Sequence, residues 1–427
     1  MTTGYKQTEV GVIPEDWEVK SAHEFSAIKT GPFGTLLKAS EYSESDGVPL
    51  ISVGEIREGY LRITDHTPRV LEAITKRLPQ YILRRGDIVF GRKGGVERSA
   101  LIRQPQEGWF LGSDGISIRS HQDCHDEYLA LQFRSTRVQS WLLKNAIGTT
   151  MPSLNQEILR NVVIPFPPTR TEQQAIAEVL SDADAFIESL EQLLAKKRHI
   201  KQGAMQELLT GKKRLPGFGG KWEVKRLDAL GRWTGGMTPS MRNPDYWQSG
   251  TVPWISSGDV KSIKLISTTL AISDYAVKQK TTTLIPEKSI IVVVRSGILR
   301  KCLPVAMNMV SMAINQDIKA LLPNADVLPE YVLQSLICNS DQILARCLKS
   351  GTTVESIEFP WFKAFTIPIP PFPEQTAIVA ILSDMDAEIA ALEAKLAKAR
   401  QIKQGMMREL LTGRIRLMNP VKSQSTG

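Results

Sequence analysis

One segment near the middle of the chain is repeated at its C-terminal end. It reads TEQQAIAEVLSDADAFIESLEQLLAKKRHIKQGAMQELLTGKKRL from Thr171 to Leu215, and PEQTAIVAILSDMDAEIAALEAKLAKARQIKQGMMRELLTGRIRL from Pro373 to Leu417. The two copies align without a gap. A repeat period of about two hundred residues is far longer than that of a solenoid protein. The chain is therefore predicted to hold a duplicated domain that is followed, in each copy, by a long helix.

The remainder of the period repeats more faintly. Recurring pieces include Trp17-Glu18-Val19-Lys20 with Trp222-Glu223-Val224-Lys225, Val48-Pro49 with Val252-Pro253, and Gly148-Thr149-Thr150 with Gly351-Thr352-Thr353. The helical segments have barely changed, whereas the globular segments have diverged. This contrast predicts that the helices form a structural frame and that the two globular segments are recognition domains of different specificity.

Composition narrows the class of protein. With 427 residues, 42% of them hydrophobic and 23% charged, the chain has the profile of a soluble protein. A formal net charge of +8 and a pI near 9.2 mildly favour an anionic partner. The four cysteines form no CxxC pair, and the N-terminus has no signal-peptide pattern. The most apolar run, 289–294, is far shorter than the ~20 residues of a membrane span. We therefore expect a soluble, cytoplasmic protein.

Both repeated segments carry a heptad pattern of apolar residues. The steps between them alternate between four and three, which is typical of a narrow coiled-coil seam that needs a partner helix. The seam positions are Ile176, Leu180, Ala183, Ile187, Leu190 and Leu194 in the first copy, and Ile378, Leu382, Met385, Ile389, Leu392, Leu396 and Ala399 in the second. In the first copy Lys197 occupies the next seam position. The other copy is the obvious partner.

Charge suggests how the helices pair. Each helix is acidic in its first half and basic in its second half, so antiparallel packing places acid against base along the whole pair. Each exposed ion pair contributes only ~0.2–1 kcal/mol, and the same gradient also suits the dipole of a single helix. An antiparallel pair that carries one globular unit near each end has a pseudo-twofold internal repeat.

The globular segments are predicted to be mixed α/β (α+β). Strands are expected at 48–56, 86–90 and 289–294, and helices at 127–143 and 330–347. Proline-rich segments, IPFPPTRTEQ and IPIPPFPEQ, lead into the long helices as stiff connectors. The predicted domains are 1–170 and 216–372, joined by helical spacers at 171–215 and 373–420 and followed by a tail at 421–427.

Several polar loops are candidates for contact with a phosphate backbone or with base edges. In the first globular segment they hold Lys29, Thr30, Arg92, Lys93, Arg98, Thr149 and Thr150; in the second they hold Thr238, Ser240, Arg242, Arg295, Arg300, Lys301, Thr352 and Thr353. Arg92 and Arg295 are expected to occupy the same place in the two copies. The alternative for any one loop is an ordinary polar turn, because turns favour the same residue types.

Taken together, these motifs resemble the DNA-specificity subunits of type I restriction-modification systems. The resemblance is carried by the EQxAI…LSDxD opening and IKQGxMxELLTGxxRL ending of each helix, by GTTxxS before IPxPP, and by WTGGMTPS…VPWISSGDV. It covers nearly the whole chain.

The resemblance implies two target recognition domains, each of which reads one half of a split, asymmetric DNA site. The helices would then be a spacer and a docking surface for two methyltransferase subunits, and motor-nuclease restriction subunits would join them for cleavage. The helix residues expected at that docking surface are Gln173, Leu180, Gln202, Gln375, Leu382 and Gln404. S-adenosylmethionine, Mg²⁺ and ATP would belong to the partner subunits. The chain itself is expected to catalyse nothing and to bind no cofactor and no metal.

Two other readings remain open. A single-chain methyltransferase or nuclease would use Asn243-Pro244-Asp245-Tyr246, or Pro244-Asp245 with Asp259-Val260-Lys261. We interpret the first as a turn and the second as a chance pattern, and the chain has no Walker A sequence.

His121, Cys124 and His125 include zinc-ligand types, but the second copy has Pro323, Asn324 and Ala325 there, which favours a surface loop. The last alternative is a non-catalytic coiled-coil interaction protein whose basic loops are incidental.

Overall fold

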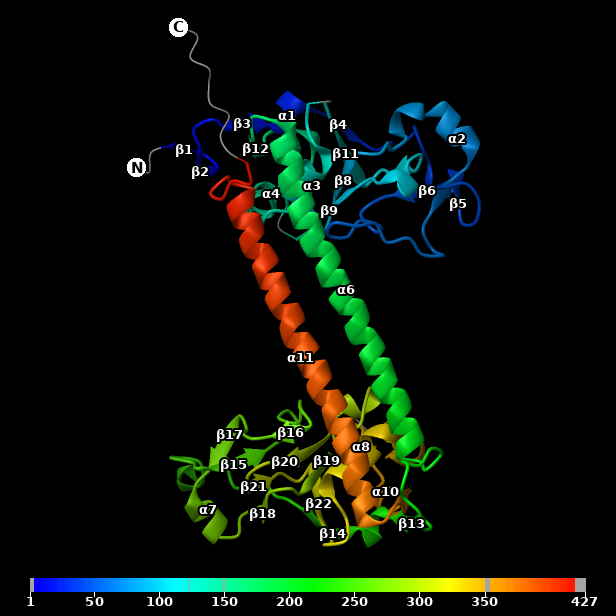
Figure 1. Ribbon diagram of the computed structural model, residues 1–427, viewed down its shortest axis with the longest axis vertical. Helices are drawn as coiled ribbons and strands as arrows, with labels where there is room; N and C mark the ends of the chain where they lie inside the picture. Colours follow the sequence, from blue (N-terminus) through cyan, green and yellow to red (C-terminus); the bar gives the residue numbers. More distant parts are fainter. Residues whose placement is uncertain (1–3, 122, 149, 350–353, 419–427) are drawn as a thin grey trace. The chain divides into compact units, whose positions relative to one another are not determined.

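The computed structural model describes residues 4–121, 123–148, 150–349 and 354–418. Three candidate residues, Thr149, Thr352 and Thr353, lie outside these ranges. The chain forms two compact units that are not successive segments. Unit 1 comprises residues 1–190 and 395–427, and unit 2 comprises residues 191–394. Each unit therefore contains one globular domain together with a part of each long helix (Figure 1).

The two long helices are α6 (Arg170–Leu208) and α11 (Phe372–Leu410), of 39 residues each. The heptad prediction is confirmed, because every seam position is buried or half-buried. Ile176 and Leu180 belong to a core cluster of unit 1, and Ile378 and Leu382 belong to a core cluster of unit 2. Most of the stability of such helices comes from packing of this kind rather than from intrinsic helix propensity.

Within each unit the stretches of α6 and α11 run antiparallel, as their charges predicted. In unit 1, Asp184 of α6 pairs with Lys403 of α11, and Glu172 pairs with Arg416 just beyond α11. In unit 2, Lys201 of α6 lies 2.5 Å from Asp386, and Lys197 lies 2.6 Å from Glu388. Lys197, which breaks the apolar seam of the first copy, thus has an acidic partner on the opposite helix.

The domain of unit 1 contains two four-stranded sheets. One has the strand order β4-β11-β8-β9 and is antiparallel throughout; the other has the order β10-β6-β7-β5, in which β10 and β6 are parallel. Their strands are β4 (Ser26–Thr30), β5 (Tyr42–Ser43), β6 (Val48–Ile51), β7 (Arg69–Val70), β8 (Ile88–Gly91), β9 (Ser99–Leu101), β10 (Phe110–Leu111) and β11 (Gly115–Ser120). The four residues of β8 are all buried, as a strand between apolar layers requires.

The domain of unit 2 repeats this arrangement with one more strand. Its sheets have the orders β14-β22-β19-β20-β16 and β17-β15-β21-β18. Their strands are β14 (Gly231–Gly235), β15 (Val252–Ile255), β16 (Lys264–Leu265), β17 (Leu270–Ile272), β18 (Thr283–Ile285), β19 (Ile290–Val293), β20 (Val305–Asn308), β21 (Met312–Ile314) and β22 (Ile318–Pro323). The mixed α/β class is therefore confirmed, although β6, β8 and β19 are shorter than the predicted strands.

Short elements complete both domains. The two segments predicted as single helices are each broken into two, because Ser135 and Asn339 interrupt them. The helices are α1 (Ala22–Phe25), α2 (Glu72–Arg77), α3 (Asp126–Phe133), α4 (Thr136–Asn145), α5 (Gln156–Arg160), α7 (Asp274–Lys278), α8 (Pro329–Cys338), α9 (Ser340–Cys347) and α10 (Phe359–Ala364). The remaining strands are β1 (Tyr5–Thr8), β2 (Gly11–Pro14), β3 (Glu18–Ser21), β12 (Val163–Phe166), β13 (Glu223–Arg226), β23 (Leu348–Lys349), β24 (Ser356–Ile357) and β25 (Thr366–Ile369).

The repeated LLTG ending closes each domain onto a long helix. Gly413, after α11, has a φ of 68°, a conformation that favours glycine, and a Cβ there would lie 2.6 Å from Pro14 of its own unit. Gly211, after α6, has a φ of 72° and packs against Trp222. The end of α11 is thus part of the first domain's core, and the end of α6 is part of the second domain's core.

Among the described residues, no helix is long and apolar enough to cross a membrane.

Candidate nucleic-acid interface

Three loops of unit 1 meet at one place. They span residues 31–34, 92–98 and, in the third loop, 147–148 with 150–154, and we call them the recognition loops of unit 1. Leu154 N donates to Arg92 O at 2.8 Å, and Gly94 N donates to Pro152 O at 2.9 Å, so the second and third loops are hydrogen-bonded. The guanidinium of Arg92 lies 5.6 Å from the ring centre of Phe33, which joins the first loop to the second. Sequence motifs that lie far apart along the chain are thereby brought together.

The predicted residues of unit 1 differ in their surroundings. Lys29 donates to Gln80 O at 3.2 Å, and the hydroxyl of Thr30 accepts from Gln156 at 3.1 Å. Arg98 lies 3.4 Å from Glu97, so part of its charge is compensated. Lys93 and Thr150 are exposed. Lys29 is exposed as well, so both lysines can meet an external anion.

The corresponding loops of unit 2, at 236–242, 294–301 and 354–357, also meet; we call them the recognition loops of unit 2. Ser296 N donates to Glu355 O at 3.0 Å, and Ile357 N donates to Val294 O at 2.8 Å. The hydroxyl of Thr238 donates to Gln316 at 2.5 Å. Asp317, the residue after Gln316, lies 4.0 Å from Arg295 of the second loop. The first loop, which holds Thr238, therefore lies near the second.

The remaining predicted residues of unit 2 divide into paired and exposed side chains. Arg300 forms an ion pair with Glu355 and so fixes the second loop against the third. Ser240, Arg242 and Lys301 are exposed on the recognition loops.

The predicted equivalence of Arg92 and Arg295 is wrong by one residue. The backbone of Arg92 corresponds to that of Val294, because Arg92 N donates to Asp114 O and Val294 N donates to Asp317 O, each at 2.8 Å. Arg295 instead matches Lys93. Both form an isolated bridge to a serine of the third loop, and each lies about 4 Å from the aspartate of its own unit, at 3.9 Å for Lys93 and 4.0 Å for Arg295. The two arginines align in the sequence only because basic residues cluster after both strands.

Exposed apolar side chains accompany the basic ones, and the sequence reasoning did not single them out. Phe33 is 59% exposed and Met151 is 61% exposed in unit 1. Met241 is 66% exposed in unit 2. Apolar and aromatic side chains next to arginine and lysine are what nucleic-acid surfaces use to stack on or wedge between bases. The signal available in the sequence was the phenylalanine within the loop Gly31-Pro32-Phe33-Gly34.

The motifs that suggested an enzyme have structural roles. Asn243 accepts from Asp245 N at 3.1 Å and starts a short 3₁₀ turn over Pro244–Tyr246, so the turn interpretation is confirmed. The carboxylate of Asp259 accepts from Ser256 N at 2.8 Å and from Thr269 N at 2.9 Å. Burial alone would raise the pKa of Asp259, but the hydrogen bonds from Ser256 and Thr269 outweigh burial and lower it. Asp259 is thus held as a charged turn-forming group.

The candidate zinc ligands are not arranged as a metal site. Cys124 is buried, and burial raises the pKa of its thiol to about 11. Nowhere in residues 4–121, 123–148, 150–349 and 354–418 do three or more His, Cys, Asp or Glu side chains gather in a way that could hold a metal ion.

Four of the six residues predicted to dock partner subunits are buried inside their own unit. Gln173 is 4% exposed and accepts from His125 N at 2.9 Å, and Gln375 accepts from Leu328 N at 2.8 Å. Leu180 and Leu382 are fully buried. These four residues therefore fix each helix to its own domain, which corrects the expectation that they face a partner. Gln202 and Gln404 are exposed.

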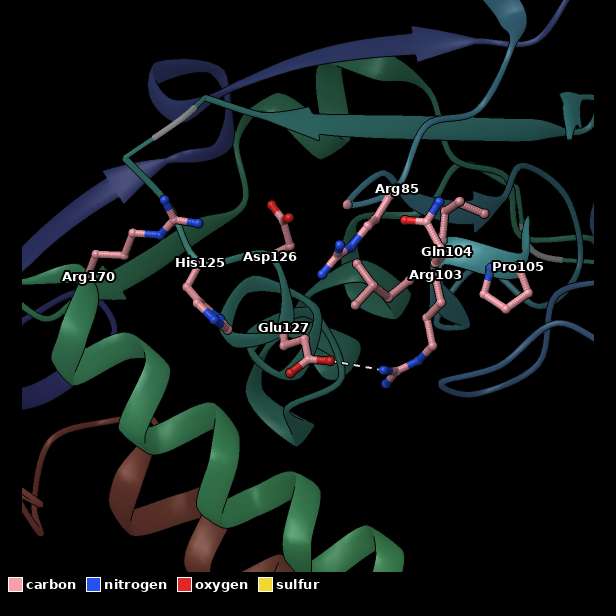
Figure 2. A pocket seen from close by; sticks show the side chains of 11 residues that line it. Arg85, Arg103, Gln104, Pro105, His125, Asp126, Glu127 and Arg170 are labelled. Atoms are coloured by element: carbon pink, nitrogen blue, oxygen red, sulfur yellow. Dashed lines mark hydrogen bonds and ion pairs between the residues drawn. The ribbon is translucent and has the colours of Figure 1, made fainter. Parts of the chain in front are cut away.

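A separate pocket of about 460 Å³ lies beside the start of α6 in unit 1, and its lining includes both arginines and the acidic residues Asp126 and Glu127. Figure 2 shows Arg85, Arg103, His125 and Arg170 around it. Arg103 lies 2.9 Å from Glu127, so one cation of the pocket is already paired. These residues belong to none of the recognition loops, and the pocket is therefore separate from the loop surface.

The chain matches the family model of the type I restriction modification DNA specificity domain twice, over residues 14–196 and 219–401. It belongs to that family.

Two relatives illustrate the relationship. Over 185 residues the chain is 36% identical to the Escherichia coli type I restriction enzyme EcoR124I/EcoR124II specificity subunit, an alignment that spans 43% of this chain and about half, 46%, of that protein. It is 24% identical to the putative type I restriction enzyme MjaX specificity subunit of Methanocaldococcus jannaschii over 97% of both chains.

Solved structures share the fold. One, from a study of complex assembly and conformational transition of the type I R-M system, superimposes with a TM-score of 0.59 at 18% identity and covers 94% of this chain and 99% of that one. The type I restriction-modification S subunit from M. genitalium superimposes with a TM-score of 0.54 at 14% identity, over 96% of this chain and 99% of that one. Two mixed α/β domains combined with two long helices are therefore a fold that this chain shares with both.

Proposed function

We propose that this chain is the non-catalytic DNA-recognition and scaffold subunit of a type I restriction-modification complex. Each unit reads one half of a split, asymmetric DNA site through its three recognition loops. The helices α6 and α11 set the unspecified spacer and dock two methyltransferase subunits. S-adenosylmethionine and the adenine chemistry belong to those subunits, and Mg²⁺ and ATP serve the motor-nuclease subunits.

The observation that carries the proposal is the loop cluster that recurs in both units. In each unit, loops from three distant parts of the sequence meet, and they expose basic and apolar side chains side by side. Lys93 and Arg295 occupy the same place but differ in chemistry: lysine is a point charge suited to phosphate, whereas arginine can also pair with the edge of a guanine. Equivalent places with different side chains support two half-sites of different sequence.

The experiment that separates this function from a coiled-coil interaction protein is DNA binding as a function of salt. If six to ten phosphates are contacted, the affinity for duplex DNA should fall by about 10³ to 10⁵ between roughly 50 and 200 mM salt. Fluorescence anisotropy with a labelled duplex measures this slope. A slope near zero would contradict the proposal and favour the interaction protein.

A further inference from the structure

A groove of about 560 Å³ lies in unit 1 between the start of α4 and the C-terminal end of α11. We call it the α4–α11 groove. Its lining is rich in basic side chains, which are Arg134, Arg137, Arg400, Lys403 and Arg408. Met407 and Leu411 add apolar surface, and Glu58 is an acidic residue of the lining. The groove therefore combines a concentrated positive charge with an apolar floor.

Two of these arginines have buried donors without an acceptor. The Nε atom of Arg134 and the Nη2 atom of Arg137 are buried and have no hydrogen-bond partner. Arg137 uses its Nη1 to donate to Val163 O at 2.9 Å, and Arg134 reaches Asp184 only at 3.8 Å. Asp184 is already paired with Lys403. A buried charged donor without a partner is costly, because it has lost its water and gained nothing in exchange.

Unit 2 lacks this concentration of charge. The residues that follow Tyr331 there, up to Ile343, include no arginine or lysine, and the counterpart of Arg408 is Gln206. Unit 2 does keep Arg198 and Lys201, the counterparts of Arg400 and Lys403. Each is 2.5 Å from an acidic residue of α11. Arg134, Arg137 and Arg408 are thus additions specific to unit 1, and they are not needed to hold the helices together.

A protein carboxylate fits this groove better than a DNA phosphate does. Arg134, Arg137 and Arg408 line the groove and Arg408 is exposed, so a flexible Asp or Glu side chain can reach these arginines, whereas a rigid duplex cannot enter a groove of this size. Arginine forms strong bidentate pairs with carboxylates. The apolar side chains of Met407 and Leu411 suit the apolar residues of a peptide, and they offer nothing to a phosphate.

We propose that the α4–α11 groove binds an acidic segment of a partner protein, whose carboxylates pair with Arg134, Arg137 and Arg408. This inference rests on the proposed function, in which the partner is a methyltransferase subunit. Because unit 2 has no equivalent of these arginines, the groove holds only one of the two methyltransferase copies.

The test uses the full chain and the methyltransferase subunit that is encoded with it. The double substitution Arg137→Gln with Arg408→Gln removes two positive charges from the groove. Native mass spectrometry counts the bound methyltransferase copies, and calorimetric titration measures the affinity of each. We expect one of the two copies to bind about 30-fold more weakly or worse, since loss of one partner from a buried charge pair is costly. The other copy should bind as in the wild type. Unchanged binding of both copies would overturn the inference.

Two controls keep the result interpretable. Lys144→Gln removes a positive charge from an exposed position of α4 outside the groove, and it should leave both copies bound. Arg408→Gln alone alters an exposed residue that the fold does not need, so a smaller loss of the same copy is expected even if the double variant unfolds. No loss in that single variant, together with an unfolded double variant, would count against the groove.

A measurement of DNA binding separates this inference from the proposed function. The double variant should bind a labelled duplex with the affinity and salt slope of the wild type. Loss of DNA affinity with both methyltransferase copies retained would instead make the groove a phosphate site and overturn the inference. A wild-type chain that binds DNA but no methyltransferase would overturn it as well. A wild-type chain that binds neither would refute the proposed function, and the inference with it.

Discussion

The carboxylate of Asp259 closes a turn in unit 2 and holds Ser256 and Thr269 through hydrogen bonds to its charged form. The pKa of Asp259 is lowered below its ordinary value of 3.8, so its contribution to stability is complete above pH 3.8 and is lost as the pH falls through the lowered pKa. We expect Asp259→Asn to cost about 1–2 kcal/mol of unfolding free energy at neutral pH. That difference should fade in acid, as urea unfolding at several pH values would show.

Glu55 takes the corresponding place in unit 1 and provides the contrast. Its carboxylate accepts from Ser52 N at 3.0 Å, but burial dominates and raises its pKa above 4.5. Its contribution is therefore largest below pH 4.5 and declines as the pH rises through the raised pKa. Glu55→Gln should leave the stability at neutral pH unchanged or higher. A loss equal to that of Asp259→Asn would contradict this assignment.

At the residue scale, the sequence predicted the kind of side chain better than its place. Motif spacing located the basic loops, but it aligned Arg92 with Arg295. The sequence pattern does not reveal which residue after a strand still takes part in the backbone hydrogen bonds of the sheet. The repeated glutamines Gln173 and Gln375 were expected at a surface, yet each binds a backbone N–H of its own domain. A buried hydrogen bond between distant segments leaves no periodic signal.

Among the elements, the ends of the long helices explain the strongest repeat in the sequence. Each EQ opening supplies a buried glutamate, and each LLTGxxRL ending supplies the arginine that pairs with the glutamate of the other copy. Arg416 lies 2.7 Å from Glu172, and Arg214 lies 2.6 Å from Glu374. Heptad spacing and charge gradient were sufficient to predict the antiparallel pairing, because both are local properties of a helix. The reciprocal glutamate–arginine pairs join residues too far apart in the sequence to be predicted from it.

We therefore expect Glu172→Gln to destabilise unit 1. Glu172 is 2% exposed, and its loss leaves Arg416 paired with Asp16, at 2.7 Å. The cost should be about 2–3 kcal/mol, somewhat below that of a wholly unpaired buried charge. Thermal unfolding measures it. Glu178→Gln, at an exposed position of the same helix, is the matched control, and equal effects of the two substitutions would contradict the assignment.

At the scale of the whole molecule, the helix pair is the element that sets the DNA spacer. An α-helix rises 1.5 Å per residue, so one added heptad lengthens it by about 10 Å, or roughly three base pairs. The insertion is placed within Ala195–Ile200 of α6 and, to keep the seam in register, within the opposite stretch 387–392 of α11. Methylation mapping should show a longer unspecified spacer between unchanged half-sites. An unchanged spacer would refute the role of the helices.

The most direct test of two independent readers is genome-wide mapping of methyladenine. The chain is co-expressed with its methyltransferase subunit in a host without adenine methylation, as the wild type, as Lys93→Ala and as Arg295→Ala. We expect one split motif that depends on this chain. Lys93→Ala should weaken or relax only one half of it, and Arg295→Ala only the other. Loss of both halves together in either variant, or no new methylation from an assembled complex, would contradict it.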